Sequence, residues 1–193
     1  MNEQPKTWVE RWTEQLAWLD GWFEAEKAVL HDFSPEERGL FDSLAPAWLA
    51  AEAGEGKIDV LESASERFGR GSVLALIEKL CADETRAWWT ELVAREGSSI
   101  DDLMRLLWEQ LSEQGFEFTV DREPGAVRIH CTHCPQYDLA AEMGATEWLY
   151  ALVCATDPHA VRPFDPPIRF QRTKTLMQGD GHCDHTYFVD SDR

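Results

Sequence analysis

A chain of 193 residues that is 44% hydrophobic and has nine tryptophans can form a folded core and is too apolar for a disordered protein. Its net charge of −18 argues against nucleic acid or an anionic membrane as partner, because phosphate groups would repel it. The chain shows no long apolar segment and no secretory signal pattern, so we expect a cytoplasmic protein. The net charge does not exclude a small-molecule substrate that is anionic, because a local pair of arginines can dominate a pocket.

Helices are expected over the first part of the chain. Apolar side chains recur at three- and four-residue steps over residues 7–30, which predicts an amphipathic helix. Ser34, followed by a proline and two acidic residues, is typical of a helix start, so a second helix should run from there towards Ala51. A short helix should follow over residues 57–67.

A longer helix is expected over residues 72–95. After it, Ser99 and Asp102 resemble a capping box with Asp in place of Glu, which predicts another helix ending at Gly115. The expected buried face of the helix over 72–95 consists of Val73, Leu76, Ile77, Leu80 and Cys81.

After residue 115 the pattern changes from the helical period to a period of two. Phe116, Phe118 and Val120 alternate with polar residues, which predicts a half-buried strand. A Pro-Gly turn then leads to a returning strand over residues 127–131.

The rest of the chain predicts a helical segment followed by a second hairpin. Residues 136–160 should be helical with a break at Gly144, and residues 168–175 and 183–189 should form paired strands. We therefore expect the α+β class, with N-terminal helices packed on a four-stranded antiparallel sheet that carries a helical insert between its two hairpins.

This organisation predicts a single domain over residues 1–193. Residues 1–115 would be its helical part, and residues 116–193 would be the sheet part that carries the functional site. No linker is visible between the two parts.

Reactive side chains concentrate between residues 130 and 185, which hold four of the five cysteines and five of the six histidines. Thiols and imidazoles bind transition metals, or act as nucleophile and base near neutral pH. An odd number of cysteines in a chain without a signal pattern favours free thiols or metal ligands over disulfides.

Strand geometry divides the first part of this cluster. If residues 130–134 are extended, His130 and Cys134 face one side while Cys131 and His133 face the other. A turn at Pro135 is plausible, because the residue before proline avoids helical geometry. These positions would place Cys134 near Cys183, with Cys154 approaching from the helical insert.

Three interpretations of the cluster remain open. A divalent metal such as zinc would suit cysteine and histidine ligands, but the second half of the cluster lacks the paired cysteines of a zinc ribbon. A catalytic thiolate could be activated by a nearby histidine or positive charge. Alternatively, the cysteines are small buried hydrophobes and the histidines lie on the surface.

A basic strand lies next to the thiols in the sequence. Arg169, Arg172 and Lys174 put positive charge on the segment that precedes Cys183. In an acidic protein this charge indicates either a ligand that carries a carboxylate or the protection of an edge strand.

The same region resembles the L-2-amino-thiazoline-4-carboxylic acid hydrolase family over about residues 100–190. The most specific part is Arg-x-x-Thr followed by Gly-Asp-x-x-Cys-Asp, which ends at Asp184. The order of strands and helices is more distantly similar to 4-vinyl-reductase-type small-molecule-binding domains. The positions that match the family best are Cys134, Asp138, Cys154, Arg172, Gly179, Asp180 and Cys183.

The resemblance implies hydrolytic opening of a thiazoline ring to a carbamoyl-cysteine, which needs a nucleophile, a proton donor and a cation for the substrate carboxylate. For this chemistry we expect Cys134 or Cys183 as the nucleophile or as the holder of a water-activating metal. We expect His133 or His185 as the proton shuttle, although His130, Cys131, His182 and His185 do not belong to the family pattern. The remaining expected roles are Asp180 as base or orienting group, Arg172 at the carboxylate, and Cys154, Asp138 and His185 at the substrate.

Two other functions are compatible with the chain. The cysteines could hold a metal or a tetrapyrrole-like ligand in a module without catalytic activity. The chain could also be a subunit of an assembly or a homo-oligomer, with one of the adjacent Trp88 and Trp89 as an exposed contact, because the two side chains cannot both face inward.

Overall fold

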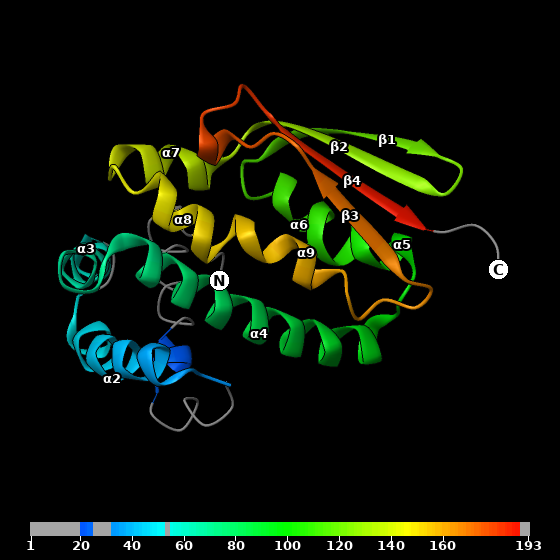
Figure 1. The fold of residues 1–193 in the computed structure, drawn as a ribbon. Coiled ribbons are helices and arrows are strands. Elements are labelled where there is room, and N and C mark those ends of the chain that lie inside the picture. Colours follow the sequence, from blue (N-terminus) through cyan, green and yellow to red (C-terminus); the bar gives the residue numbers. More distant parts are fainter. Residues whose placement is uncertain (1–19, 25–31, 53–54, 190–193) are drawn as a thin grey trace, which may run out of the picture. The chain divides into compact units, whose positions relative to one another are not determined.

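The computed structural model describes residues 20–24, 32–52 and 55–189. It divides into two compact units, residues 1–80 and 81–193, and the division falls inside one long helix (Figure 1). The expected helix over residues 7–30 lies largely outside the described residues, and only a short 3-10 turn, η1 (Gly21–Phe23), is seen there. The single-domain organisation stays a prediction.

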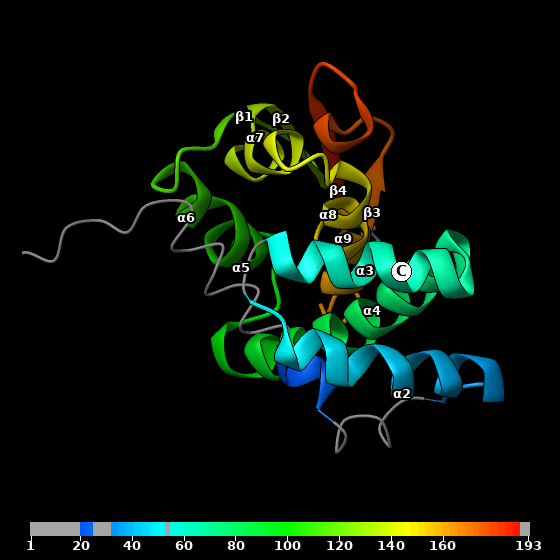
Figure 2. The same ribbon diagram turned by 90° about the vertical axis from the view of Figure 1, so that its left-hand side faces the viewer.

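The first unit is built from the helices expected there. Helix α2 (Pro35–Ala50) begins at Ser34, whose hydroxyl accepts a hydrogen bond from the Glu37 amide while the Glu37 carboxylate accepts one from the Ser34 amide. Helix α3 (Glu55–Phe68) packs against α2 (Figure 2). The capping signal at Ser34 therefore predicted the start of α2 correctly.

Helix α4 (Arg70–Glu96) is the long helix expected over residues 72–95. The five residues expected on its buried face are all buried. Near its C-terminal end Trp89 is 5% exposed and Trp88 is 46% exposed, so the two tryptophans do face in different directions.

The helix that was expected to run from Ser99 to Gly115 consists of three consecutive segments: α5 (Ile100–Leu103), the π-helical turn η3 (Met104–Trp108) and α6 (Glu109–Ser112). Ser99 and Asp102 form the expected capping box. Gly115 follows α6 with a φ of +89°, a left-handed conformation that favours glycine.

The second unit contains the expected antiparallel sheet, formed by β1 (Glu117–Glu123), β2 (Ala126–His133), β3 (Ile168–Arg172) and β4 (Cys183–Val189). The strand order is β1-β2-β4-β3, so β1 and β3 are the edges. One expectation was wrong: Val120 is 40% exposed, because only the start of edge strand β1 packs on the core. The α+β class is confirmed.

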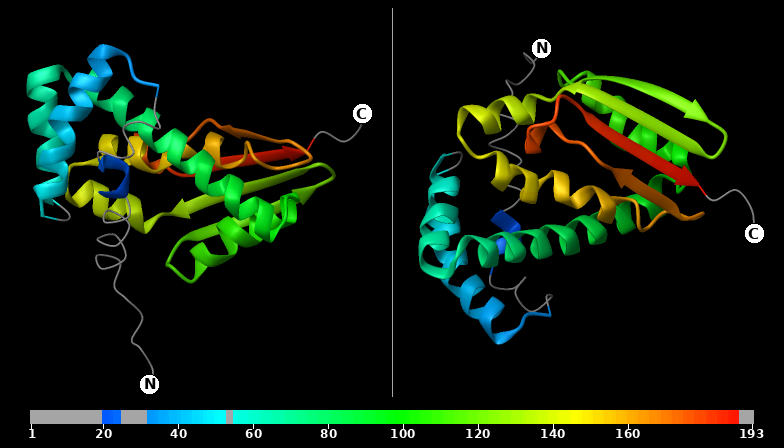
Figure 3. Two further views of the ribbon diagram at one scale, coloured as in Figure 1. Left: turned by 90° about the horizontal axis from the view of Figure 1, so that it is seen from below. Right: turned by 45° about the horizontal axis from the view of Figure 1, so that its top comes forward.

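The insert between the hairpins is helical, as expected. It comprises α7 (Pro135–Glu142), α8 (Thr146–Leu152), the turn η4 (Cys154–Thr156) and α9 (Asp157–Ala160). A further turn, η5 (Leu176–Gln178), precedes β4 and packs against α8. Figures 1 and 3 show α5, α6 and α9 on one face of the sheet, while none of the helices in the described part of the chain covers the opposite face.

The core of the second unit lies between this helical layer and the sheet. It is formed chiefly by Trp89, Leu92, Leu103, Met104, Trp108, Val127, Ile129, Phe164, Ile168, Leu176 and Tyr187.

No helix within residues 20–24, 32–52 and 55–189 is both long and apolar enough to cross a bilayer.

Candidate functional site

Four thiols of the second unit gather where β2 ends and β4 begins. Cys131 and Cys183 are direct partners across the two strands. Cys134 and Cys154 both lie close enough to Cys183 for a charge on its sulfur to affect their pKa values, and Cys154 is affected by Cys134 in the same way. The expected grouping of Cys134, Cys154 and Cys183 is therefore seen in the structure.

Cys131 also belongs to this group, although strand alternation alone had placed it on the face away from Cys134. Strand β2 ends at His133, and Cys134 is the N-cap of α7, so the alternation no longer applies at that position. Cys131 is 2% exposed and lies within electrostatic range of both Cys134 and Cys183.

Burial keeps three of these thiols protonated. It raises the pKa of Cys131 to about 12 and that of Cys134 to about 11, and it also raises the pKa of Cys154. The backbone amides of Tyr137 and Gln136, at the start of α7, oppose this effect at Cys134. A thiolate nucleophile at neutral pH is therefore disfavoured at these three positions.

Cys183 is placed differently from the other thiols. Its sulfur accepts a hydrogen bond from the Leu176 amide at 3.3 Å and donates one to the Thr175 hydroxyl at 3.7 Å. Of the two candidate nucleophiles named from the sequence, Cys183 is the one whose sulfur is hydrogen-bonded to Thr175.

A pocket of about 340 Å³ lies beside this thiol, between β3 and the helical insert. It is lined by residues 170–175 together with Tyr150, Pro158 and Gln178. Thr175 connects the two features, because it lines the pocket and also receives the hydrogen bond from Cys183. The volume suits a small molecule.

Arg172 lines the pocket but is held firmly by the protein. Its side chain is 7% exposed and forms an ion pair with Asp157. Its second terminal nitrogen donates a hydrogen bond to the Cys154 carbonyl at 3.0 Å and lies 3.5 Å from the Tyr150 hydroxyl. Most of its donors are therefore satisfied by the protein itself.

Asp157 also meets His185, the partner of Arg172 across β3 and β4. Nε2 of His185 lies 3.4 Å from the Asp157 carboxylate, and the imidazole packs edge-on against Trp108. Among the described residues, Nδ1 of His185 is buried without a hydrogen-bond partner. Asp157 was not among the site residues expected from the sequence, and the structure shows it as the residue shared by Arg172 and His185.

His133 and Asp138 form a separate pair near the start of α7. Nε2 of His133 lies 2.8 Å from the Asp138 carboxylate, and Nδ1 lies 2.9 Å from the Gly115 carbonyl oxygen. Because both ring nitrogens meet acceptors, the protonated imidazole is favoured, and the hydrogen bond to Asp138 raises the pKa of His133. Neither side chain lines the pocket.

Two aspartates hold the loop between β3 and β4. Asp180 is exposed and accepts a hydrogen bond from the Thr175 amide at 2.8 Å. Asp184 accepts hydrogen bonds from the amides of Thr173 and Lys174 at 2.8 and 2.6 Å. Asp180, named from the sequence as base or orienting group, thus orders the wall of the pocket.

His130 and His182 lie together outside the pocket, with ring centroids 4.2 Å apart. Within the described part of the chain, no group of three or more His, Cys, Asp or Glu side chains is arranged to hold a metal ion. These side chains are therefore not arranged as the zinc interpretation requires.

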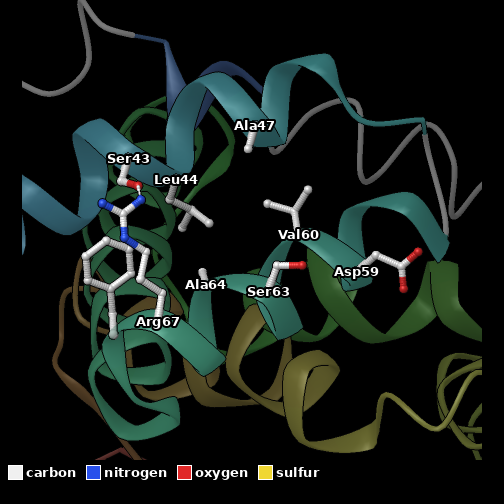
Figure 4. A pocket seen from close by; sticks show the side chains of 9 residues that line it. Ser43, Leu44, Ala47, Asp59, Val60, Ser63, Ala64 and Arg67 are labelled. Atoms are coloured by element: carbon white, nitrogen blue, oxygen red, sulfur yellow. Dashed lines mark hydrogen bonds between the residues drawn. The ribbon is translucent and has the colours of Figure 1, made fainter.

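The first unit has a pocket of its own, of about 400 Å³, between α2 and α3 (Figure 4). Its lining is largely small or apolar, with Leu44, Val60 and Ala64 at its centre and Ser43 and Arg67 at one end. No thiol or imidazole lines it, so it does not coincide with the site predicted from the sequence.

Comparison with known proteins gives one result. A family model described as L-2-amino-thiazoline-4-carboxylic acid hydrolase matches residues 49–187, a range that includes the four clustered thiols and the whole pocket beside them. No curated protein and no solved structure matches the chain. The more distant similarity to 4-vinyl-reductase-type domains stays a prediction.

Proposed function

Because the chain belongs to the L-2-amino-thiazoline-4-carboxylic acid hydrolase family, we propose that it hydrolyses a small cyclic amidine that carries a carboxylate. The named candidate is 2-amino-thiazoline-4-carboxylate, with carbamoyl-cysteine as the product. One observation carries the proposal: Thr175 lines a basic pocket of about 340 Å³ and is hydrogen-bonded to the sulfur of Cys183. A polar pocket is thereby joined to a thiol.

The reaction requires attack on the ring carbon between sulfur and nitrogen. A new bond forms from this carbon to the attacking water oxygen, and the bond from the carbon to the ring sulfur breaks. One proton of the water passes to the departing sulfur and the other to the ring nitrogen, so the carbon becomes the carbonyl of the product. If a thiol attacks first, its sulfur bonds to this carbon while the bond to the ring sulfur breaks and the ring sulfur takes up the thiol proton. Water then adds to the same carbon, the bond to the enzyme sulfur breaks, and the thiol regains a proton. Cys183 is the thiol best placed for that role, because its sulfur is hydrogen-bonded to Thr175, which lines the pocket.

The proton transfers need a residue that can both accept and donate. His185 is the better candidate of the two predicted histidines, because its ring lies on the same side of β4 as Cys183 and beside Asp157. His133 is favoured in its charged form, which suits a proton donor rather than a base.

The direct test is to incubate the purified protein with 2-amino-thiazoline-4-carboxylate and to follow carbamoyl-cysteine by mass spectrometry. We expect turnover by the wild type and its loss in Cys183→Ala. Cys81→Ala is the matched control, because Cys81 is also buried but lies outside the thiol group. No product from a folded wild-type protein would reject the proposal.

A second candidate function is a small-ligand-binding module without catalytic activity. It is favoured by the raised pKa values of Cys131 and Cys134, about 12 and 11, which leave both groups as neutral thiols. Binding of the thiazoline without any product, measured by calorimetry and mass spectrometry on the same sample, would support this candidate over the hydrolase.

A further inference from the structure

Two cationic side chains belong to the wall of the pocket beside Cys183, Arg172 and Lys174. They differ in how far the protein already uses their charge. The guanidinium of Arg172 is paired with Asp157, bonded to the Cys154 carbonyl and 7% exposed. To bind the carboxylate of a ligand, Arg172 would have to give up a buried ion pair, and Asp157 would then face the incoming anion.

The charge of Lys174 is not paired in this way. Among the residues that the structure describes, its ammonium group has no ion-pair or hydrogen-bond partner, and the residue is exposed. Its flexible four-carbon stem allows the ammonium group to reach an anion in the pocket.

The backbone of Lys174 is nevertheless held in place. Its amide donates to the Asp184 carboxylate at 2.6 Å, and its carbonyl accepts a hydrogen bond from the Asp184 amide at 3.3 Å. The neighbouring Thr173 donates to the same carboxylate through its amide, at 2.8 Å. Lys174 therefore has a backbone that is held in place and a charged side chain that is available beside the pocket.

We propose that Lys174 is the residue that selects a ligand with a carboxylate, while Arg172 holds Asp157 and the pocket wall in place. The ligand class is a small organic monoanion. The role of the carboxylate as part of a substrate rests on the proposed function, but the selection of an anion by Lys174 does not. In this proposal Lys174 binds the substrate carboxylate, a role that was expected of Arg172 from the sequence.

The experiment uses ligand-observed NMR on the full chain with two probes, 2-amino-thiazoline-4-carboxylate and 2-amino-thiazoline, which lacks the carboxylate. The same spectra report any hydrolysis. We expect Lys174→Gln to weaken binding of the carboxylate probe about tenfold, the size of one favourable charge contact, and to leave the second probe unchanged. Lys174→Arg should restore the preference for the carboxylate.

Arg169→Gln is the matched control, because Arg169 lies on the same basic segment but does not line the pocket. It should leave the binding of both probes unchanged. Equal binding of the carboxylate probe by the wild type and Lys174→Gln would overturn the inference, as would equal losses for both probes or no binding by the wild type.

The two proposals fail separately. Hydrolysis without any effect of Lys174→Gln would leave the proposed function standing and remove the inference. Carboxylate-dependent binding without hydrolysis would support the inference and reject the hydrolase.

Discussion

Cys131 and Cys183 are direct partners across β2 and β4, and both are buried. Their pairing brings two sulfur atoms from separate segments of the chain to the same end of the sheet. The ionisation of one thiol disfavours that of its neighbour, so Cys183 contributes to the raised pKa of Cys131 after the larger effect of burial. The pKa of a thiol in this cluster therefore depends on the ionisation of its neighbours as well as on its own burial.

We expect the free energy of unfolding to fall as the pH rises from about 9 towards 12. Burial raises the pKa of Cys131 to about 12 and that of Cys134 to about 11, from an ordinary value of 9.0. The folded state keeps protons that the unfolded chain releases, so this stability is present below pH 9 and is lost above it. Urea unfolding across this range should show a smaller decline in the Cys131→Ser, Cys134→Ser double variant than in the wild type. Equal declines would contradict the assignment.

Replacing Asp157 with alanine should destabilise the protein by about 3–5 kcal/mol, because it leaves a buried guanidinium without its partner. The side chain of Arg172 is 7% exposed and that of Asp157 is 24% exposed. Asp101→Ala removes an ion pair whose side chains are 52% and 76% exposed, and should cost about 0.5 kcal/mol or less. Denaturant titration of both variants compares the two pairs, and similar losses would contradict the larger cost expected for leaving the buried Arg172 unpaired.

Asp184→Ala should loosen the backbone at Thr173 and Lys174, at a cost of about 1–3 kcal/mol for the lost hydrogen bonds. Hydrogen exchange of those two amides should become faster. Asp180→Ala is the matched comparison, because that carboxylate accepts from the Thr175 amide instead. Faster exchange at all three amides in both variants would mean that the loop opens as one unit.

The pH dependence of Asp184 has the opposite sign to that of the thiols. Burial raises its pKa, but hydrogen bonds from Thr173 and Lys174 outweigh this effect and lower the pKa overall. The stability that Asp184 contributes is therefore present above its ordinary pKa of 3.8 and is lost as the pH falls through the lower value of the folded state.

Asp138→Asn should bring the pKa of His133 down towards its ordinary value of 6.5, because the hydrogen bond from the imidazole to Asp138 is the main cause of the rise. An NMR titration of the His133 ring protons measures this change. The effect on stability should be below about 1 kcal/mol, since the two side chains are 41% and 57% exposed. It would appear only at pH values below the pKa of the folded state. An unchanged titration would show that the Gly115 carbonyl holds the proton alone.

Local signals in the sequence predicted much of the fold. The capping residues Ser34 and Ser99 marked two helix starts, and the period of two after Gly115, together with the turn signals that follow, marked the four strands. The end of β3 was the main difference in the sheet. A strand had been expected up to Thr175, but the carboxylate of Asp184 captures the amides of residues 173 and 174 and ends the strand at Arg172.

The site was less accessible from the sequence, because its residues depend on how distant segments meet. Alternation along one strand excluded Cys131, and only the register of β2 against β4 shows it opposite Cys183. Asp157 sits in the helical insert, so its position between Arg172 and His185 depends on the docking of that insert on the sheet. No local pattern encodes such a contact.

The π-helical turn η3 has a consequence for how this chain tolerates changes in length. A π turn holds one residue more than an α turn, and here it ends at Trp108, whose indole nitrogen donates to the Tyr187 hydroxyl at 3.0 Å. The extra residue is taken up within the turn, so deleting one residue within 104–107 would convert the turn to α-helix while the two flanks keep nearly the same relative orientation. In a regular α-helix the same deletion would rotate one flank by about 100°. The Ser99 cap and the indole would both keep their directions, so a one-residue deletion here should disturb the core less than one in a neighbouring α-helix.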